Sequence, residues 1–252
     1  MSVVALYVPG SRPDRFDKAA ASGAEVILDL EDSVAPGERP AAREAVAGWV
    51  ASYDGPVQVR VNAPGSDDLA ADLAALPPHV ELRVPKVESP DDLEALAGRR
   101  VHALVESALG VERAFEIARA PQVVTVALGE SDLRAELGLD GEEAFDWVRS
   151  RLVVAAAAAG HPAPMMSAYP DVRDTAGLEE SCRRGRGLGM RGRTAIHPSQ
   201  VPVICSVFAP SEAEVAWARE VLAALTGTGV ATLADGSMVD EAMARRARSI
   251  LG

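Results

Sequence analysis

The sequence predicts an α/β protein: a (β/α)8 TIM barrel over residues 1–209, followed by a C-terminal helical extension over residues 210–252. Eight short apolar runs rich in β-branched residues recur along the chain, and helical patterns separate them. This alternation is typical of βα units around a parallel sheet. Eight such units in 252 residues match the size of one barrel. No linker rich in Gly, Ser or Pro divides the chain before about residue 209, so we expect one barrel domain and then the extension.

The predicted strands follow one another in a regular order. They begin near residues 3, 25, 57, 80, 101, 123, 163 and 193, and the last two are the weakest as strands. Helix start signals stand between them, at Arg12-Pro13, Pro36 and Ser89-Pro90. Two further helical patterns lie beyond residue 210. An open doubly wound sheet is the alternative arrangement of the same units.

Charge and cysteine content limit the class of partner and the compartment. The formal net charge is -12, from 37 acidic and 25 basic residues, which argues against nucleic acid or an anionic membrane surface as the main partner. The chain has two cysteines and shows no signal peptide, so we expect a cytoplasmic protein without a disulfide framework. The longest stretch of low polarity, residues 151–160, is far shorter than the roughly 20 apolar residues of a membrane span.

Polar residues close the predicted strands, and the active sites of barrel enzymes lie at these carboxyl ends. The residues concerned are Asp29, Glu31, Asp32, Arg60, Asn62, Lys86, Glu106, Glu130, Asp132 and His197. A rim that served only solubility would not need charges at the ends of buried strands. We therefore expect the active site at this end of the barrel.

Glu106 and Asp132 are the candidate metal ligands. Glu106 ends the fifth predicted strand and Asp132 follows the sixth, so an ion between these strands would meet both carboxylates. Two carboxylates with water or substrate oxygens commonly hold Mg²⁺ in proteins. The sequence has no Cys/His cluster of the kind that binds zinc. The structural alternatives are a helix N-cap for Asp132 and an ion pair with Lys86 or Arg60 for Glu106.

The other charged residues near these strand ends suit an anionic substrate. The Arg60 guanidinium would bind a carboxylate or stabilise a developing oxyanion. Glu31 would orient metal-bound water or a basic residue. Asp32 would cap the following turn or accept a bond from a basic neighbour.

The loop after the first predicted strand suits a phosphorylated ligand. It places Gly10, Arg12, Arg15 and Lys18 around a helix start, where backbone N–H groups and basic side chains bind phosphate. A solvated helix face would explain Arg15 and Lys18 equally well.

Eight segments, in the same order, resemble the citrate lyase beta-subunit family and its malyl-CoA and citramalyl-CoA lyase relatives. They are LYVPGSRPDRFDKA, LDLEDSV, RVNAPGS, PKVES, LVESALGV, LGESDL, AIHPSQV and DGSMVDEAM, and they are distributed over nearly the whole chain. The resemblance implies a TIM-barrel lyase of the phosphoenolpyruvate/pyruvate superfamily. Such a lyase would use Mg²⁺ to break or form a carbon–carbon bond in a 3-hydroxyacyl thioester. The thioester would be carried by CoA or an acyl carrier, and the oxo acid would be glyoxylate, pyruvate or oxaloacetate.

The resemblance also implies roles for particular residues. Glu106 and Asp132 would be the metal ligands, and Arg60 would bind the substrate and stabilise the enolate oxygen. Asp240 would be the acid/base group, contributed in a homotrimer by the C-terminal lid of the neighbouring subunit; a cap of the last helix is its structural alternative. The residues implied at the thioester site are Tyr7, Lys18, Ile196, His197 and Pro198. Further candidates at strand ends and in the first loop are Arg12, Arg15, Asn62 and Lys86 for binding and Glu31 for catalysis.

The chain departs from the family pattern at two positions. Relatives often carry lysine where Asp14 and Arg193 stand, so the expected phosphate contacts fall to Arg12 and Arg15.

Other function classes stay open at this point. They are a barrel aldolase acting on free keto acids and the beta subunit of a citrate lyase complex acting on a carrier-protein thioester. A Schiff base at Lys86 is disfavoured, because nothing in the sequence desolvates this lysine specifically.

Overall fold

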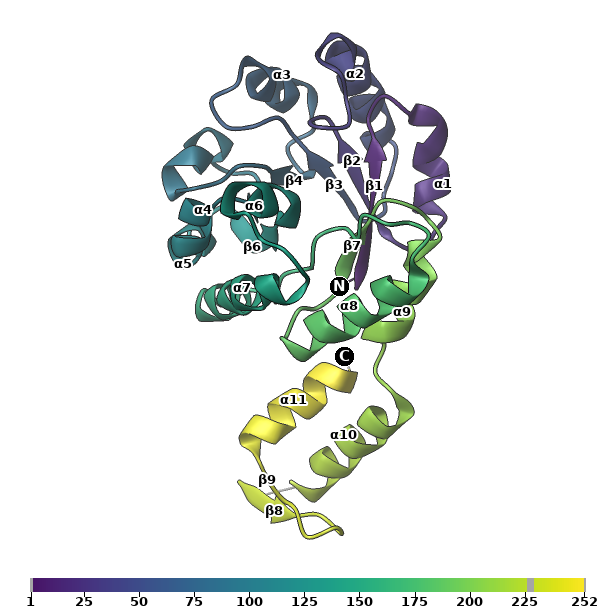
Figure 1. Ribbon diagram of the computed structural model, residues 1–252, viewed down its shortest axis with the longest axis vertical. Helices are drawn as coiled ribbons and strands as arrows, with labels where there is room; N and C mark the ends of the chain where they lie inside the picture. The colour runs from purple at the N-terminus through teal and green to yellow at the C-terminus, as the bar shows by residue number, and fades with distance from the viewer. Residues whose placement is uncertain (1, 226–228, 252) are drawn as a thin grey trace. The chain divides into compact units, whose positions relative to one another are not determined.

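The computed structural model describes residues 2–225 and 229–251, and the chain divides into two compact units, Met1–Phe208 and Ala209–Gly252. The first unit is a curled parallel sheet of seven strands in the order β6-β5-β4-β3-β2-β1-β7, with helices on its outer side (Figure 1). The strands are β1 Val4–Pro9, β2 Glu25–Asp29, β3 Val57–Arg60, β4 Glu81–Val84, β5 Val101–Val105, β6 Val123–Leu128 and β7 Arg193–Ala195. The TIM-barrel-like α/β class predicted from the sequence is confirmed.

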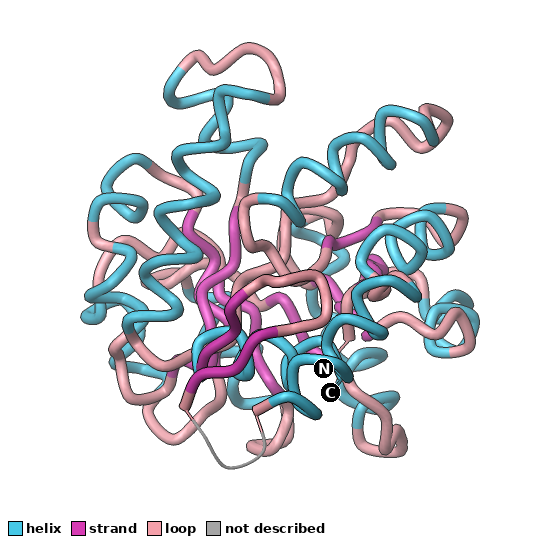
Figure 2. Tube along the Cα trace, turned by 90° about the horizontal axis from the view of Figure 1, so that it is seen from below, coloured by secondary structure: helices cyan, strands magenta, loops and turns pink. Residues whose placement is uncertain are grey.

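The helices of the first unit lie between the strands along the chain, as βα units require. In Figure 2 the helices of this unit, in cyan, lie around the parallel strands, in magenta. The α-helices are α1 Phe16–Ala20, α2 Arg39–Val50, α3 Asp67–Ala75, α4 Ala108–Glu112, α5 Ala114–Ala118, α6 Glu130–Leu137, α7 Asp146–Ala158, α8 Thr175–Gly187 and α9 Gln200–Phe208. The 3-10 helices are η1 Pro13–Arg15, η2 Pro36–Glu38, η3 Pro90–Leu96 and η4 Glu143–Phe145.

The predicted helix starts are confirmed. Proline stands in the first turn of η1, η2 and η3, where its missing N–H costs no helical hydrogen bond. The start of η3 is further fixed by a capping box between Ser89 and Asp92.

Strand β5 is buried at all five positions, as expected of a parallel strand covered on both faces.

The strand register brings oppositely charged residues together at the carboxyl edge of the sheet. At the end of β2, Asp29 lies opposite Arg60 of β3 and Pro9 of β1. Parallel pairing therefore fixes the neighbours of Asp29 before any side chain is considered.

The structure differs from the predicted barrel at the segment near residue 163, where a strand was expected. It contributes one parallel bridge, between Met166 and Arg193, and no strand. Pro162 and Pro164 have no N–H to give to a strand ladder. The segment nevertheless lies between the edge strands β6 and β7.

Backbone bonds tie the segment to one edge strand, and side-chain bonds tie it to the other. The Met166 N–H donates to Gly192 O at 2.9 Å, on the side of β7. The Thr125 hydroxyl of β6 donates to Pro162 O at 2.9 Å, and the Ser167 hydroxyl donates to Leu128 O. The side chains of Thr125 and Ser167 thus replace a backbone ladder with β6.

The second unit is a small helical unit with a hairpin. It consists of α10 Glu212–Ala224, the antiparallel strands β8 Val230–Thr232 and β9 Met238–Asp240, and α11 Glu241–Leu251. The two helical patterns predicted beyond residue 210 are present. Its own apolar cluster includes Ala218, Val221, Leu233, Val239 and Ala247.

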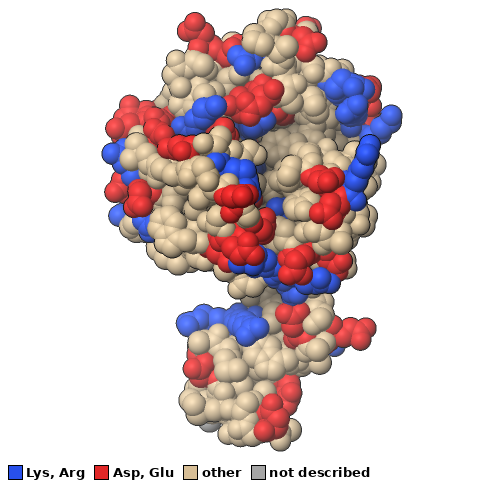
Figure 3. All heavy atoms as spheres, in the orientation of Figure 1, with Lys and Arg blue, Asp and Glu red and all other residues tan. Residues whose placement is uncertain are grey.

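The exterior of the barrel unit carries both signs of charge. On the face shown in Figure 3, its basic side chains are interspersed with acidic ones. None of the helices in the described ranges is long and apolar enough to cross a membrane.

Candidate active site

Two cavities lie at opposite ends of the strands. The cavity at the carboxyl ends has a volume of about 430 Å³ and is lined, among others, by Tyr7, Arg15, Arg60, Glu106, Asp132 and Ile196. The cavity at the amino ends is larger, about 850 Å³, and is lined by residues that include Glu25, Glu81 and His102. We take the smaller cavity as the candidate active site, because barrel active sites lie at the carboxyl ends and because its carboxylates are strongly perturbed.

Arg60 is held at the wall of this cavity by the acids that follow β2. Its Nε and Nη2 atoms donate to the two carboxylate oxygens of Asp29, both at 2.7 Å, and Nη1 donates to Asp32 Oδ2 at 3.1 Å. Glu31 Oε2 lies 3.0 Å from Nη1 but is not aligned for a hydrogen bond. The guanidinium also lies over the Tyr7 ring, 5.1 Å from its centroid. The cluster of acids in LDLED therefore fixes one cation.

Asp29 is the central partner in this cluster. Besides Arg60, its carboxylate accepts the N–H groups of Glu31 at 3.0 Å and Ser33 at 3.1 Å, which closes the turn after β2. Burial alone would raise the pKa of Asp29, but the bonds from Arg60 outweigh it and lower the pKa. Burial would likewise lower the pKa of Arg60, and the bond and charge of Asp29 raise it instead. Both groups are therefore charged at neutral pH.

Replacement of Arg60 by glutamine should destabilise the protein strongly. It leaves the Asp29 carboxylate, which is 2% exposed, without its cation, and an uncompensated buried charge of this kind costs about 3 kcal/mol. Urea unfolding in the presence of a chelator measures the change in unfolding free energy. Arg12→Gln is the matched control, because Arg12 pairs with Asp14 on the surface and its loss should leave the midpoint unchanged. Equal midpoints for the two variants would contradict this account of the cluster.

Glu106 and Asp132 lie on the wall of the same cavity. Glu106 follows β5, is 6% exposed, and its Oε1 accepts the Lys86 N–H at 2.8 Å. Lys86 has a φ of 56°, in the left-handed region that residues other than glycine rarely adopt, and this turn presents its N–H to Glu106. Asp132 is in the first turn of α6 and is exposed. The N-cap of that helix is Gly129, so the N-cap alternative for Asp132 is wrong.

Gly129 makes room for Glu106. A Cβ atom at position 129 would lie 2.4 Å from both Cβ and Oε2 of Glu106. Real Cβ atoms do not approach other atoms so closely, so any larger residue at 129 would displace the carboxylate. The sequence signal for this role was the glycine of LGESDL, directly before the α6 acids.

Two carboxylates at this end of the barrel, Glu106 and Glu31, lack sufficient compensation from the protein. Burial, followed by the charge of Asp132, raises the pKa of Glu106 to about 7. Burial also raises the pKa of Glu31 to about 7, although Arg60 opposes the shift. A cation between Glu106 and Asp132 would relieve the repulsion between them.

The pair fits a magnesium ion in number and in kind. Within residues 2–225 and 229–251, no group of three His, Cys, Asp or Glu side chains is arranged to hold a metal ion. Two carboxylates that leave the remaining positions to water or substrate oxygens are what Mg²⁺ commonly uses. Glu106 and Asp132 are therefore suitable ligands, whereas a closed site formed by protein side chains alone is not seen among the described residues.

Several predicted site residues do not line this cavity. They are Arg12, Lys18, Glu31, Asn62, Lys86, His197 and Pro198. Asn62 is buried, and its Nδ2 donates to Leu30 O at 3.1 Å and Asp72 Oδ2 at 2.8 Å, so it joins β3 to its neighbours. The Lys86 ammonium is 3.8 Å from Glu31 Oε1. His197 is exposed, and its Nδ1 is 2.8 Å from the Ser199 hydroxyl.

Asp240 lies in the second unit, directly before α11. Its Oδ1 accepts the Met243 N–H at 3.0 Å, so the carboxylate caps the last helix. The side chain is exposed, and among the described residues Oδ2 has no hydrogen-bond partner.

The sequence did not single out Arg149, Glu142 and Ser167, which support the start of α6. Arg149 of α7 is fully buried; its Nε donates to Glu130 Oε1 at 2.8 Å, and its Nη2 lies 2.7 Å from Glu142 Oε1. The Glu130 N–H in turn donates to Ser167 Oγ at 2.8 Å. These bonds fix the start of the helix that carries Asp132. The one available signal was the position of Arg149, a charged residue on the helix face that also carries the buried Leu152 and Ala156.

The fold and this cavity define a TIM-barrel enzyme with an acidic site at the carboxyl edge of its sheet. Residues 4–198 match the sequence model of the HpcH/HpaI aldolase/citrate lyase family, and the chain belongs to this family. It is 40% identical over 256 residues to a citrate lyase subunit beta-like protein of Mycobacterium tuberculosis, covering 98% of this chain and 93% of that protein. It is 33% identical over 298 residues to an L-malyl-CoA/beta-methylmalyl-CoA lyase of Rhodobacter capsulatus, covering 98% and 92%.

The fold of a solved structure supports the same family membership. The protein CitE of Mycobacterium tuberculosis, in complex with magnesium, acetoacetate and coenzyme A, superposes with a TM-score of 0.86 at 38% identity. The match covers 99% of this chain and 97% of that one. The resemblance seen in the sequence is thereby confirmed, and the chain is an oxo-acid lyase of the citrate lyase beta group.

Proposed function

We propose that this protein is a Mg²⁺-dependent carbon–carbon lyase that cleaves or forms a 3-hydroxyacyl thioester such as malyl-CoA, citramalyl-CoA or a citryl thioester. The observation that carries the proposal is the placement of Glu106 and Asp132 in one cavity with the fixed cation Arg60. The CitE complex with magnesium, acetoacetate and coenzyme A supports it as an analogy.

Glu106 and Asp132 would hold the metal. Bound there, Mg²⁺ would polarise the hydroxyl and carboxylate oxygens of the part of the substrate that becomes the oxo acid. Glu106 is oriented for this by the Lys86 N–H and by the space that Gly129 leaves. Asp132 is oriented by the helix start that Arg149 and Ser167 fix.

Arg60 would stabilise the negative charge that develops on the thioester oxygen during cleavage. Its position is already set by Asp29 and Asp32, so little reorganisation is needed when the charge appears. Glu31 contacts Arg60 and Lys86 instead of the cavity, so it acts on the substrate through these two cations. Arg15 and Ile196 line the cavity and would contact the thioester carrier.

Asp240 would exchange the proton at the enolate carbon. In cleavage it donates the proton to that carbon, and in condensation it removes it. We assign this role to Asp240 of a neighbouring subunit in a homotrimer, with the second unit serving as a lid. The exposure of its carboxylate supports the assignment.

A carrier-protein thioester is the second candidate substrate. The relative named citrate lyase subunit beta-like protein supports it. A further alternative, an aldolase acting on free keto acids, would not need a thioester at all. The three differ in the acyl carrier, so a turnover assay separates them.

Purified protein should cleave malyl-CoA or citramalyl-CoA in the presence of Mg²⁺. Release of glyoxylate or pyruvate should stop on addition of chelator, and Asp240→Asn should lower kcat by about a hundredfold or more, because proton transfer is lost. Mixing this variant with Asp132→Asn under conditions that exchange subunits should restore about a quarter of the activity if the two residues act across an interface.

The assay also identifies the alternatives. Turnover only with an acyl-carrier thioester would point to a citrate lyase beta subunit. Turnover of free 4-hydroxy-2-keto acids at equal efficiency would contradict a thioester lyase.

Magnesium affinity should fall as the pH is lowered below 7. Glu106 must lose its proton to bind the ion, and its pKa is about 7, so the affinity should drop about tenfold per pH unit below that value. The folded state favours the protonated form of Glu106, so the metal-free protein should lose stability as the pH rises from 4.5 to about 7. Calorimetric titration with Mg²⁺ and thermal unfolding with and without chelator measure the two effects.

The matched variants are Glu106→Gln and Glu31→Gln. Glu106→Gln should bind no Mg²⁺ and should be more stable than wild type at pH 8 in chelator. Glu31→Gln should keep the pH-dependent binding, because Glu31 does not line the cavity. Affinity that does not change between pH 6 and 8 in the wild type would refute Glu106 as a ligand.

A further inference from the structure

The segment that joins α7 to α8 closes the barrel between β6 and β7. One parallel bridge joins this segment to β7, between Met166 and Arg193, and the Thr194 N–H donates to Met166 O at 3.0 Å. A ladder that continued in this register would next bond the Ile196 N–H to the Ala168 carbonyl. In the structure, the Ile196 N–H has a different acceptor.

Gln200 supplies this acceptor and joins the two segments. Its side chain is at the start of α9 and is 2% exposed. Its Oε1 accepts the N–H groups of Ile196 at 2.9 Å and His197 at 3.3 Å, and its Nε2 donates to Tyr169 O at 2.9 Å. A side-chain amide has the same kinds of donor and acceptor as a peptide group. Gln200 therefore takes the place of one peptide unit between the end of β7 and the neighbouring segment.

The position of this amide sets the spacing of one wall of the candidate active site. Ala168, directly before Tyr169, and Ile196 both line the cavity, and we call them the neutral wall. Neither carries a charge, and Ile196 is 45% exposed. Because Ile196 bonds to Gln200, which also holds the carbonyl of Tyr169, the length of the Gln200 side chain fixes the distance between the two parts of the neutral wall.

The charged groups of the cavity lie on other elements. Arg60 ends β3, Glu106 follows β5, and Asp132 is in the first turn of α6. Strand β3 is the fourth of seven in the sheet order, so Arg60 lies across the barrel from the closure between β6 and β7. A substrate with a charged acyl end and a neutral arm therefore fits in one direction, with its arm at the neutral wall.

We propose that Gln200 is a positioning residue that sets the spacing of the neutral wall and thereby the affinity for the arm of the thioester substrate. The inference rests on the proposed lyase function, because the arm belongs to the substrate of that reaction. Gln200 does not line the cavity itself, so its loss should weaken the binding of the arm without slowing bond cleavage. A residue that only stabilised the start of α9 would change the free energy of unfolding and leave both kinetic constants as they are.

Gln200→Met keeps the length of the side chain and removes its three hydrogen bonds. The substrate is malyl-CoA or citramalyl-CoA, whichever the wild type cleaves. KM should rise about tenfold while kcat stays within about twofold, the pattern of lost binding that is equal in the ground state and the transition state. The affinity for Mg²⁺, measured by calorimetry, should not change. An unchanged KM, or an equal fall of kcat and kcat/KM, would overturn the proposal.

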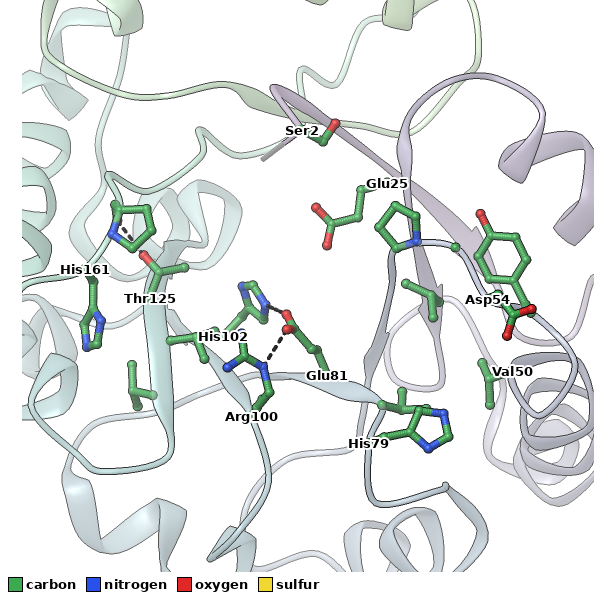
Figure 4. A pocket seen from close by; sticks show the side chains of 18 of the residues that line it. Ser2, Glu25, Val50, Asp54, His79, Glu81, Arg100, His102, Thr125 and His161 are labelled. Atoms are coloured by element: carbon green, nitrogen blue, oxygen red, sulfur yellow. Dashed lines mark hydrogen bonds and ion pairs between the residues drawn. The ribbon is translucent and has the colours of Figure 1, made fainter. Parts of the chain in front are cut away.

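Thr125→Val is the matched control, because Thr125 fastens the same segment at its other end. The Thr125 hydroxyl donates to Pro162 O at 2.9 Å, beside the larger cavity at the amino ends of the strands (Figure 4). This variant should lose stability in urea, as Gln200→Met does, and should keep the KM of the wild type. An equal rise of KM in both variants would show that KM follows the stability of the segment and would overturn the proposal.

Gln200→Glu is the milder variant and tests the same contacts through pH. A protonated carboxyl group can accept from Ile196 and donate to Tyr169 O, as the amide does, whereas an ionised carboxylate cannot donate. At saturating Mg²⁺, the ratio of its KM to that of the wild type should therefore be near one at about pH 5.5 and should rise towards about pH 8. A ratio that does not change with pH would overturn the proposal even if Gln200→Met does not fold.

The wild-type measurement separates this inference from the proposed function. If the wild type cleaves neither a CoA thioester nor an acyl-carrier thioester, the proposed function fails and the inference fails with it. If the wild type cleaves a thioester and Gln200→Met cleaves it with the same KM, only the inference about Gln200 fails.

Discussion

The structure depends on one constraint: a parallel sheet brings the carboxyl ends of its strands to a single edge, and this chain places acids there. Asp29, Glu31, Glu106 and Asp132 cannot all be ionised near one another without positive charge between them. Arg60 supplies that charge for the acids after β2. Among the described residues, no cation forms an ion pair with Glu106 or Asp132. Burial, followed by the charge of Asp132, raises the pKa of Glu106 to about 7.

The same constraint explains why other residues hold Glu106 and Asp132 in fixed positions. Arg149 neutralises Glu130 in the first turn of α6. Asp132 of the same turn lines the cavity, and no described cation pairs with it. The strained backbone of Lys86 and the missing side chain of Gly129 both act on the position of Glu106. Residues after β4 and after β6 thus act on the one carboxylate that follows β5, which is typical of a group whose position matters for chemistry.

The sequence predicted the parts of the fold that depend on local pattern. The apolar runs, the prolines at helix starts and the position of Glu106 after β5 follow from periodicity and from capping chemistry. The segment at residues 162–167 could not be predicted in this way, because it is held to β6 by the side chains of Thr125 and Ser167. Arg149 was missed for a similar reason: its partners Glu130 and Glu142 are brought to it only by the folded loops. Asn62 is the opposite case, a residue that the sequence predicted at the site and the structure places elsewhere. It stands at a strand end, but its side chain bonds to Asp72 and does not line the cavity.

The central claim is that the unpaired carboxylates Glu106 and Asp132 together bind a divalent ion. The most direct measurement is a crystal structure of the protein grown with Mn²⁺, with anomalous diffraction recorded at the manganese edge. The account predicts an anomalous peak at bonding distance from a carboxylate oxygen of Glu106 and one of Asp132. A strong peak elsewhere in the barrel unit, with both of these carboxylates bare, would contradict it.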